Sequence, residues 1–144
     1  VLLQPENADY WFMLGKAYSS ARKLNKAILA FTKASELNPY DYDTWIMCAQ
    51  MLFKKRRIAE AISMLQRLLE YNNDDAVIHY RLAAYCAYQG DLSAAQKYLK
   101  QGLKLNYQEH TEMFRLFPKT RTLQLFRQII DSKHQSALVF KKSR

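Results

Sequence analysis

Apolar and polar residues follow one another along this chain with the spacing of amphipathic helices, and the pattern returns with a 34-residue period. In its first copy Trp11, Leu14 and Tyr18 lie three and four positions apart, which places them on one face of a helix. A polar joint follows, and then a second apolar stripe with the same spacing. The pattern predicts two antiparallel helices here, over residues 9–21 and 24–37.

Two further copies of the pattern predict two further pairs of helices. They cover residues 42–54 and 58–71 in the second copy, and 76–89 and 92–105 in the third. Where the third pair turns, Gly90 can adopt the left-handed backbone that ends a helix. Short acidic side chains stand where the first helices of the second and third pairs begin, and they can accept hydrogen bonds from free N–H groups. These residues are Asp41, Asp43, Asp74 and Asp75.

Four columns of residues keep the same period through all three copies. The columns are Trp11, Trp45 and His79; Leu14, Cys48 and Leu82; Gly15, Ala49 and Ala83; and Ala27, Ala61 and Ala95. The small residues of the last two columns predict close contact between the helices of a pair, because larger side chains there would push the helices apart. One pair cannot bury its own apolar face, so we expect the pairs to stack.

These residues resemble the tetratricopeptide repeat (TPR) family, whose pattern places eight residue types at fixed offsets within one period. The first copy matches all eight, as Trp11, Leu14, Gly15, Tyr18, Ala27, Phe31, Ala34 and Pro39. The later copies depart at single positions, with Asn73 in place of the proline and His79 in place of the tryptophan. The resemblance implies an all-α fold, a right-handed α-α superhelix with repeats at 8–41, 42–75 and 76–109.

The ends of the chain depart from the three repeats. Leu3 and Pro5 precede Leu37 and Pro39 by one full period, so we expect residues 1–7 to be the tail of a preceding repeat in a longer array. After residue 109 the register stops. Apolar residues then predict a capping pair of helices within 110–133, a short one before Pro118 and a longer one over about 120–133. We expect residues 134–144 to form a disordered basic tail.

The net charge of +9 is concentrated near the C-terminus, where residues 110–144 carry eight basic and two acidic side chains. Binding of nucleic acid or acidic ligands by this set is one hypothesis. The basic members within the expected cap are Arg115, Lys119, Arg121, Arg127 and Lys133. We do not expect nucleic acid to be the main partner, because the aromatic residues here fit a core. The basic run at 54–57 is interpreted as a solvated turn, with contact to an acidic protein or nucleic acid as the alternative.

The residues that would support catalysis or metal binding are scattered. Cys48 and Cys86 fall at apolar positions, where we expect buried, reduced thiols. His79, His110 and His134 lie far apart in the repeat register, and no clustered zinc ligands or glycine-rich phosphate loop occurs. We therefore predict neither an enzyme nor a bound cofactor or metal. No apolar run reaches the roughly 18 residues typical of a membrane span.

The TPR resemblance implies a concave groove lined by the first helix of each pair, which would bind an extended peptide or helix of another protein. The residues expected to line it are Phe12, Met13, Lys16, Ile46, Met47, Gln50, Lys54, Tyr80, Arg81 and Tyr88. An apolar strip rimmed by charge is typical of interaction sites. The alternative is that some of these side chains pack against the next repeat or the cap.

One subgroup of the family makes a specific expectation possible. Co-chaperones with this fold hold the C-terminal carboxylate of heat-shock chaperones with lysine, asparagine, asparagine, lysine and arginine. The five matching positions here hold Phe12, Lys16, Met47, Val77 and Arg81, and only Arg81 agrees. We therefore do not predict binding of a chaperone tail by that clamp.

The resemblance leads to an expected function as a protein-interaction module, a scaffold or adaptor. Self-association is a second hypothesis, because Trp11 and Tyr18 at the start of the array could present an apolar end to another copy.

Overall fold

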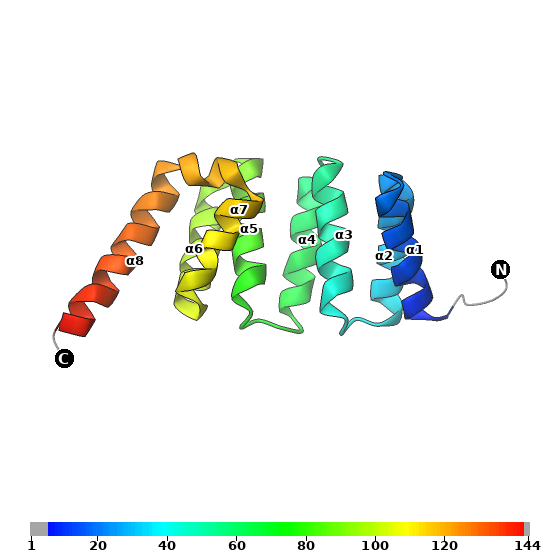
Figure 1. Cartoon of the computed structure of the whole chain (residues 1–144), viewed down its shortest axis with the longest axis horizontal. Coiled ribbons are helices and arrows are strands. Elements are labelled where there is room, and N and C mark those ends of the chain that lie inside the picture. The colour runs from blue at the N-terminus through cyan, green and yellow to red at the C-terminus, as the bar shows by residue number, and fades with distance from the viewer. Residues whose placement is uncertain (1–5, 143–144) are drawn as a thin grey trace. The chain divides into compact units, whose positions relative to one another are not determined.

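The computed structural model describes residues 6–142, and the side chains of residues 6–136. This part of the chain consists of helices joined by short turns, with no strand (Figure 1). The helices are α1 (Ala8–Ser20), α2 (Leu24–Leu37), α3 (Tyr42–Lys54), α4 (Ile58–Leu69), α5 (Ala76–Gln89), α6 (Leu92–Leu105), α7 (His110–Leu116) and α8 (Gln124–Lys142), with short 3₁₀ helices η1 (Tyr107–Glu109) and η2 (Pro118–Thr122). The expected all-α class is confirmed.

The six repeat helices begin and end within two residues of the limits predicted from the repeat period. Side chains cap three of them. Asn7 accepts a hydrogen bond from the Tyr10 amide, and Asp75 accepts one from the Val77 amide at 2.8 Å. Asp91 accepts one from the Ala94 amide at 3.1 Å. The expected acidic cap is thus present at Asp75.

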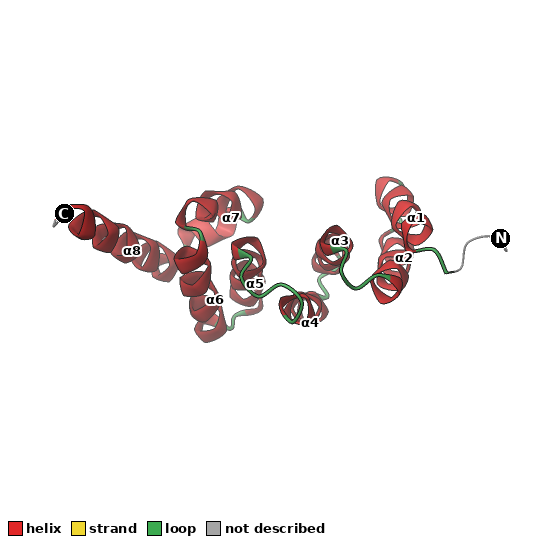
Figure 2. Ribbon diagram, turned by 90° about the horizontal axis from the view of Figure 1, so that it is seen from below, coloured by secondary structure: helices red, strands yellow, loops and turns green. Residues whose placement is uncertain are grey.

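The chain forms two compact units, residues 1–73 and 74–144, and each has its own core. In unit 1, α1 packs against α2, α2 against α3, and α3 against α4. Each first helix, α1 or α3, lies above its second helix, α2 or α4, in the view of Figure 2. The largest fully buried side chains here are Phe31, Trp45, Leu65 and Leu68.

The small residues of the repeat columns lie at tight helix contacts, as predicted. A Cβ atom added at Gly15 would come within 2.7 Å of the Phe31 ring, so only glycine fits there without a shift. The alanines Ala27, Ala49 and Ala61 are 0% exposed. Because these columns carry almost no side chain, α1 can approach α2, and α3 can approach α4, closely enough to bury the larger residues around them.

Unit 2 combines one repeat with the helices that follow it. The pair α5 and α6 forms its centre, α7 packs on α5, and α8 packs on α6. Its core includes Leu82, Tyr85, Leu99 and Phe126, each 0% exposed. His79, which occupies the tryptophan column, is buried with its ring 6.1 Å from that of Tyr98. His79 therefore takes the buried position that the tryptophan holds in the second repeat.

The C-terminal segment differs from the expectation in its length. The short helix α7 ends before Pro118 as predicted, but α8 continues to Lys142 instead of ending near residue 133. A disordered tail from residue 134 is therefore not observed up to Lys142. No glycine or proline occurs between Leu123 and Lys142, so nothing in the sequence terminates the helix. Residues 1–5 of the expected preceding repeat lie outside the described residues.

The joint between the two helices of each repeat contains one residue with left-handed backbone. These residues are Arg22 (φ 58°), Arg56 (φ 63°) and Gly90 (φ 92°), and each follows the last by one repeat period. The expectation for Gly90 is confirmed, and the same conformation occurs at two arginines. A non-glycine residue in this region is strained, because its Cβ approaches the following carbonyl oxygen.

Both cysteines are buried and free, as predicted. Burial raises the pKa of the Cys86 thiol to about 11, and it also raises the pKa of Cys48. A protonated, buried thiol is a poor nucleophile. Both side chains therefore act as small apolar residues of the core.

Candidate interaction surfaces

The first expected surface in unit 1 begins on α1. Met13 is 60% exposed, and Phe12 beside it is half-buried with its ring 5.8 Å from that of Phe31. The ammonium group of Lys16 lies 5.6 Å from the centre of the Phe12 ring, a distance at which a cation is attracted to the ring face. This part of α1 combines an exposed thioether, an aromatic ring and a positive charge.

Helix α3 contributes the neighbouring part of this surface. Met47, one period after Met13, is half-buried, and so is Gln50, whereas Lys54 is exposed. The Ser19 hydroxyl of α1 donates a hydrogen bond to the Met51 sulfur of α3 at 3.4 Å, which links the two helices. We call the set Phe12, Met13, Lys16, Met47, Gln50 and Lys54 the first-helix face of unit 1.

Two expected groove residues, Ile46 and Tyr80, are buried in the core instead. Phe12, Ile46 and Tyr80 occupy the same position of successive repeats, and Ile46 and Tyr80 are only 8% and 3% exposed. Ile46 belongs to α3, which packs against both α2 and α4. The expectation that Ile46 and Tyr80 line an open groove is therefore corrected, since a ligand cannot reach side chains that are buried to this extent.

Tyr80 is held inside unit 2 by α6. Its hydroxyl donates a hydrogen bond to the Asn106 carbonyl at 2.7 Å, and burial raises the pKa of this phenol. The ring fills the space left by the missing side chain of Gly102, where an added Cβ would lie 3.0 Å from it. Tyr80 is thus a structural residue that fixes the end of α6.

The other α5 residues of the predicted groove meet the C-terminal cap. Arg81 is 9% exposed. Hydrogen bonds from Arg115 are the main reason that the pKa of Glu112 is lowered, and the charge of Arg81 lowers it further. The Tyr88 ring lies 6.2 Å from that of Phe117 and 5.8 Å from the Lys119 ammonium group. The alternative of packing against the cap therefore describes Arg81 and much of Tyr88.

A small pocket of about 360 Å³ remains beside Tyr88. It is lined by Ala87, Tyr88, Lys119, Thr120, Thr122 and Leu123. Tyr88 is the one expected groove residue of unit 2 that still borders an open space, because Tyr80 and Arg81 are buried.

The C-terminal basic residues make several contacts within unit 2. Arg115 forms a two-pronged ion pair with Glu112, and the Arg121 guanidinium lies 5.6 Å from the centre of the Phe114 ring. Lys119 lies over Tyr88, whereas Arg127 and Lys133 are exposed on α8. Three members of the set thus already contact aromatic or acidic groups of their own unit.

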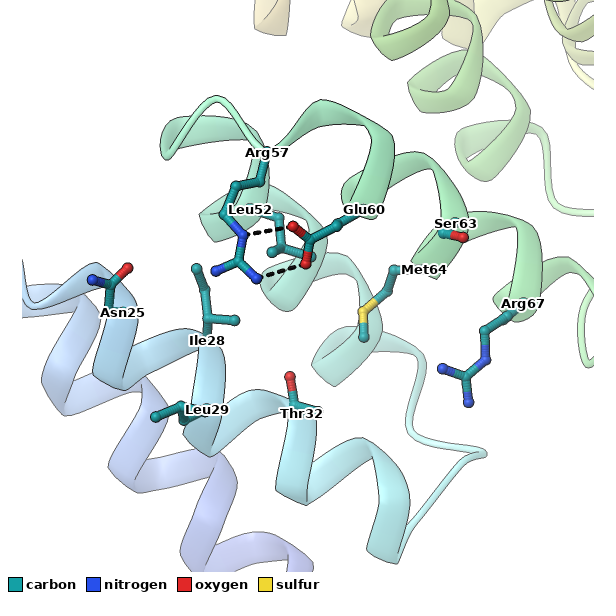
Figure 3. A pocket seen from close by; sticks show the side chains of 10 residues that line it. All are labelled: Asn25, Ile28, Leu29, Thr32, Leu52, Arg57, Glu60, Ser63, Met64 and Arg67. Carbon is teal, nitrogen blue, oxygen red and sulfur yellow. Dashed lines mark hydrogen bonds and ion pairs between the residues drawn. The ribbon is translucent and has the colours of Figure 1, made fainter.

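A further pocket lies between the second helices of unit 1, and the sequence analysis missed it. Its volume is about 560 Å³ (Figure 3). It is lined by Asn25, Ile28, Leu29, Thr32, Leu52, Arg57, Glu60, Ser63, Met64 and Arg67. Leu29 is 71% exposed, although the equivalent positions of the other repeats hold Ser63 and Lys97. An apolar residue in an otherwise polar column was the signal for this pocket.

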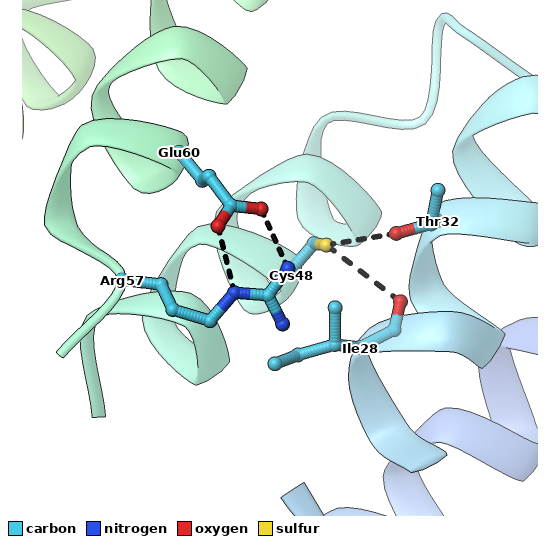
Figure 4. A network of polar contacts seen from close by, with 5 residues as sticks. All are labelled: Ile28, Thr32, Cys48, Arg57 and Glu60. Atoms are coloured by element: carbon cyan, nitrogen blue, oxygen red, sulfur yellow. Dashed lines mark hydrogen bonds and ion pairs between the residues drawn. The ribbon is translucent and has the colours of Figure 1, made fainter. Parts of the chain in front are cut away.

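An ion pair holds a guanidinium group within this pocket. The Arg57 Nε and Nη2 atoms donate hydrogen bonds to the two Glu60 carboxylate oxygens at 2.8 and 2.6 Å (Figure 4). These bonds lower the pKa of Glu60. Arginine has five N–H donors, so three remain for another acceptor. Nearby, the Cys48 sulfur lies 3.6 Å from the Thr32 hydroxyl, which lines the same pocket.

Neither a metal site nor a membrane span is indicated within the described residues. No group of three or more histidine, cysteine, aspartate or glutamate side chains is arranged to hold an ion in this part of the chain. None of the helices described has the length and apolar character needed to cross a bilayer.

Comparison with known families identifies the repeats. Residues 2–112 match the family described as the TPR domain of cytochrome c-type biogenesis protein H. The chain belongs to this TPR family. The family resemblance drawn from the sequence is therefore confirmed, and the match extends from the N-terminal residues to the start of α7. Comparison with curated proteins gave no match.

Solved structures of other TPR proteins are similar to this TPR chain in fold. The first TPR domain of Spaghetti (RPAP3) bound to the HSP90 peptide SRMEEVD is 21% identical, with a TM-score of 0.66, and the similarity covers 83% of this chain and 97% of that one. MamA is 19% identical with a TM-score of 0.66, covering 93% and 82%. PcrH in complex with the chaperone-binding region of PopB is 15% identical with a TM-score of 0.66, covering 81% and 96%. These similarities confirm the α-α superhelical fold class.

Proposed function

We propose that this TPR domain is a protein-interaction module that binds a peptide or helix of a partner protein on its first-helix face. The observation that carries the proposal is the side chain of Met13, 60% exposed beside the partly exposed Phe12 and the charged Lys16. Burying such a side chain against a partner is favourable, and methionine can adapt to ligands of different shape. Two of the similar structures, those of RPAP3 and PcrH, contain a bound segment of another protein.

The test compares partner recovery by the intact chain and by a variant of this face. The substitutions Phe12→Glu, Met13→Glu and Met47→Glu place carboxylates on it. The matched control carries Ala59→Glu, Gln66→Glu and Ser93→Glu, which add the same charge at exposed positions of second helices. Circular dichroism first establishes that both variants keep the helix content of the parent.

Affinity purification with quantitative mass spectrometry then decides the result. We expect the first-helix variant to lose the partners that both the intact chain and the control variant retain. Recovery of the same partners in the same amounts by all three proteins would show that this face does not bind them.

Self-association is a second candidate, supported by the incomplete cover on α1. Gly15 is the one buried residue of α1, and Trp11 and Tyr18 are half-buried. Tyr10 is 41% exposed and packs edge-on against Trp11 at 5.5 Å. Sedimentation velocity over a range of concentrations tests this candidate, since a constant monomer mass up to high concentration would exclude it.

A further inference from the structure

Unit 1 carries its positive charge at one end. The two joints of its helix pairs, α1–α2 and α3–α4, lie at the same end of the unit (Figure 1). They and the first turns that follow hold Arg22, Lys23, Lys26 and the basic run at residues 54–57, all exposed. We call this set the basic edge. Seven cations there are accompanied by one carboxylate, that of Glu60.

The charges of the basic edge are largely uncompensated. Arg57 pairs with Glu60, and the Lys26 ammonium group lies 5.7 Å from the centre of the Tyr18 ring. Within residues 6–136, the other five cations of the edge form no ion pair. The remaining acidic residues of the first two repeats, such as Asp9, Asp41 and Glu70, belong to other turns of the helices. Clustered charges of one sign attract ligands of the opposite sign over a distance.

The backbone also keeps arginine at two strained positions of this edge. Arg22 and Arg56 have φ angles of 58° and 63°, whereas the equivalent residue of the third repeat is Gly90. Glycine would relieve this strain at either position. A strained residue that is retained on the surface is consistent with a use for its side chain.

The basic edge leads directly into the pocket between α2 and α4. Asn25, two residues after Lys23, and Arg57, the last residue of the basic run, both line that pocket. Figure 3 shows the Arg57–Glu60 pair pointing into the space between the two helices. Ile28, Leu52 and Met64 supply buried apolar groups around it. A cationic rim thus adjoins an aliphatic cavity.

We propose that the basic edge and this pocket bind an acidic segment of another protein, with carboxylates on the edge and an aliphatic side chain in the pocket. The charge of the edge selects an anionic partner. The lining of the pocket favours a peptide over nucleic acid, because it contains no aromatic ring on which a base could stack. The pocket is lined mainly by the second helices α2 and α4, and Lys54 is the one residue that the basic edge shares with the first-helix face. One chain therefore has separate places for two segments.

The experiment is a titration of the isotope-labelled chain followed by NMR. The probe is a 12-residue peptide containing six glutamates around two leucines, and a second peptide replaces both leucines with serine. We expect the leucine peptide to shift the amide signals of residues 22–29 and 54–64. Loss of the leucines is expected to weaken binding about tenfold, because an aliphatic side chain would leave its pocket.

Variants of the basic edge test whether its positive charges are needed to bind the acidic peptide. Lys23→Gln, Lys55→Gln and Arg56→Gln together are expected to weaken binding about tenfold, since each exposed charge contributes modestly. The matched control carries Lys97→Gln, Lys100→Gln and Lys104→Gln on α6, with the same loss of charge, and we expect a change within about twofold. Leu29→Glu places a carboxylate at the pocket rim and is expected to weaken binding of the leucine peptide.

Several outcomes would overturn the proposal. Equal weakening by the control variant would show a response to net charge alone. Equal affinity for the leucine and serine peptides would show that the pocket does not contribute to binding. Tighter binding of a 15-nucleotide poly-dT strand, or of phosphatidylserine vesicles, at the same residues would assign the edge to nucleic acid or membrane. The absence of signal shifts at residues 22–29 and 54–64 at low salt would exclude the site altogether.

Discussion

Gly15 shows at the scale of a residue how one position controls the approach of two helices. We predict that Gly15→Ala lowers the free energy of unfolding by a net value of about 1 kcal/mol. Alanine by itself would stabilise the helix by nearly as much, but the overpacking at this contact costs more than that gain. The added methyl group would lie 2.7 Å from the Phe31 ring, which is 0% exposed and has little room to move. Urea unfolding followed by circular dichroism measures the change.

A second substitution separates the clash from other effects of Gly15→Ala. Phe31→Leu makes room at the contact, so the double variant should be more stable than the sum of the two single changes predicts. Strict additivity would show that the ring does not cause the loss.

Arg56 offers the opposite case, in which a substitution relieves strain. We predict that Arg56→Gly raises the free energy of unfolding by about 0.5–1 kcal/mol, because glycine adopts a left-handed φ without steric conflict. The φ angle of Arg56 is 63°. Thermal and urea unfolding measure the gain. Arg56→Gln removes the charge and keeps the strain; an equal gain there would show that charge repulsion is the cause.

Caps determine where elements begin, and Asp75 tests this at the scale of a helix. Its carboxylate accepts a hydrogen bond from the Val77 amide at 2.8 Å at the start of α5. We predict that Asp75→Ala costs about 1 kcal/mol of stability and that Asp75→Asn costs much less, because asparagine also caps. Urea unfolding of both variants checks this, and an equal loss would assign the effect to charge.

The repeat period predicted the six repeat helices well because the spacing of the apolar residues follows from the packing of one helix against the next. All six repeat helices have limits within two residues of the expectation. The prediction that the last helix ends near residue 133 was wrong, because α8 continues to Lys142. The sequence there contains no helix-breaking residue, but its local apolar pattern alone did not show that the helix continues. The period predicts the limits of helices that recur in each repeat, but it gives no information about a helix that occurs only once.

The candidate surfaces were harder to predict than the elements. Tyr80 was placed in a groove by analogy with the repeat, but the missing side chain of Gly102 creates the space that its ring fills. Arg81 influences Glu112 of the cap, Tyr88 contacts Phe117, and the register stops before the cap. Conversely, the exposure of Met13 and Lys16 follows from their positions within the repeat alone. Arg81 and Tyr88 were mispredicted because their neighbours in the cap lie outside the repeat, whereas Ile46 and Tyr80 are buried within the repeats themselves.

At the scale of the whole molecule, the excess of positive charge opposes folding through repulsion. The net charge is +9. We predict that raising the NaCl concentration from low to near-physiological levels increases the melting temperature by about 2 °C, because salt screens exposed charges. Thermal unfolding followed by circular dichroism measures this.

Two charge variants show where the repulsion arises. The variant Lys23→Gln, Lys55→Gln, Arg56→Gln should respond less to salt than the variant Lys97→Gln, Lys100→Gln, Lys104→Gln, because the basic edge concentrates the cations. A melting temperature that falls with added salt would contradict the prediction.

The positions of the two tryptophans give the chain optical reporters. Trp45 is 2% exposed, with its indole N–H donating to the Pro39 carbonyl at 2.9 Å, whereas Trp11 is half-buried. Residues 74–144 contain no tryptophan. Indole fluorescence therefore reads the opening of residues 1–73 alone, while far-ultraviolet signals sum both halves. A difference in midpoint between the two probes would reveal whether the halves melt together or one after the other.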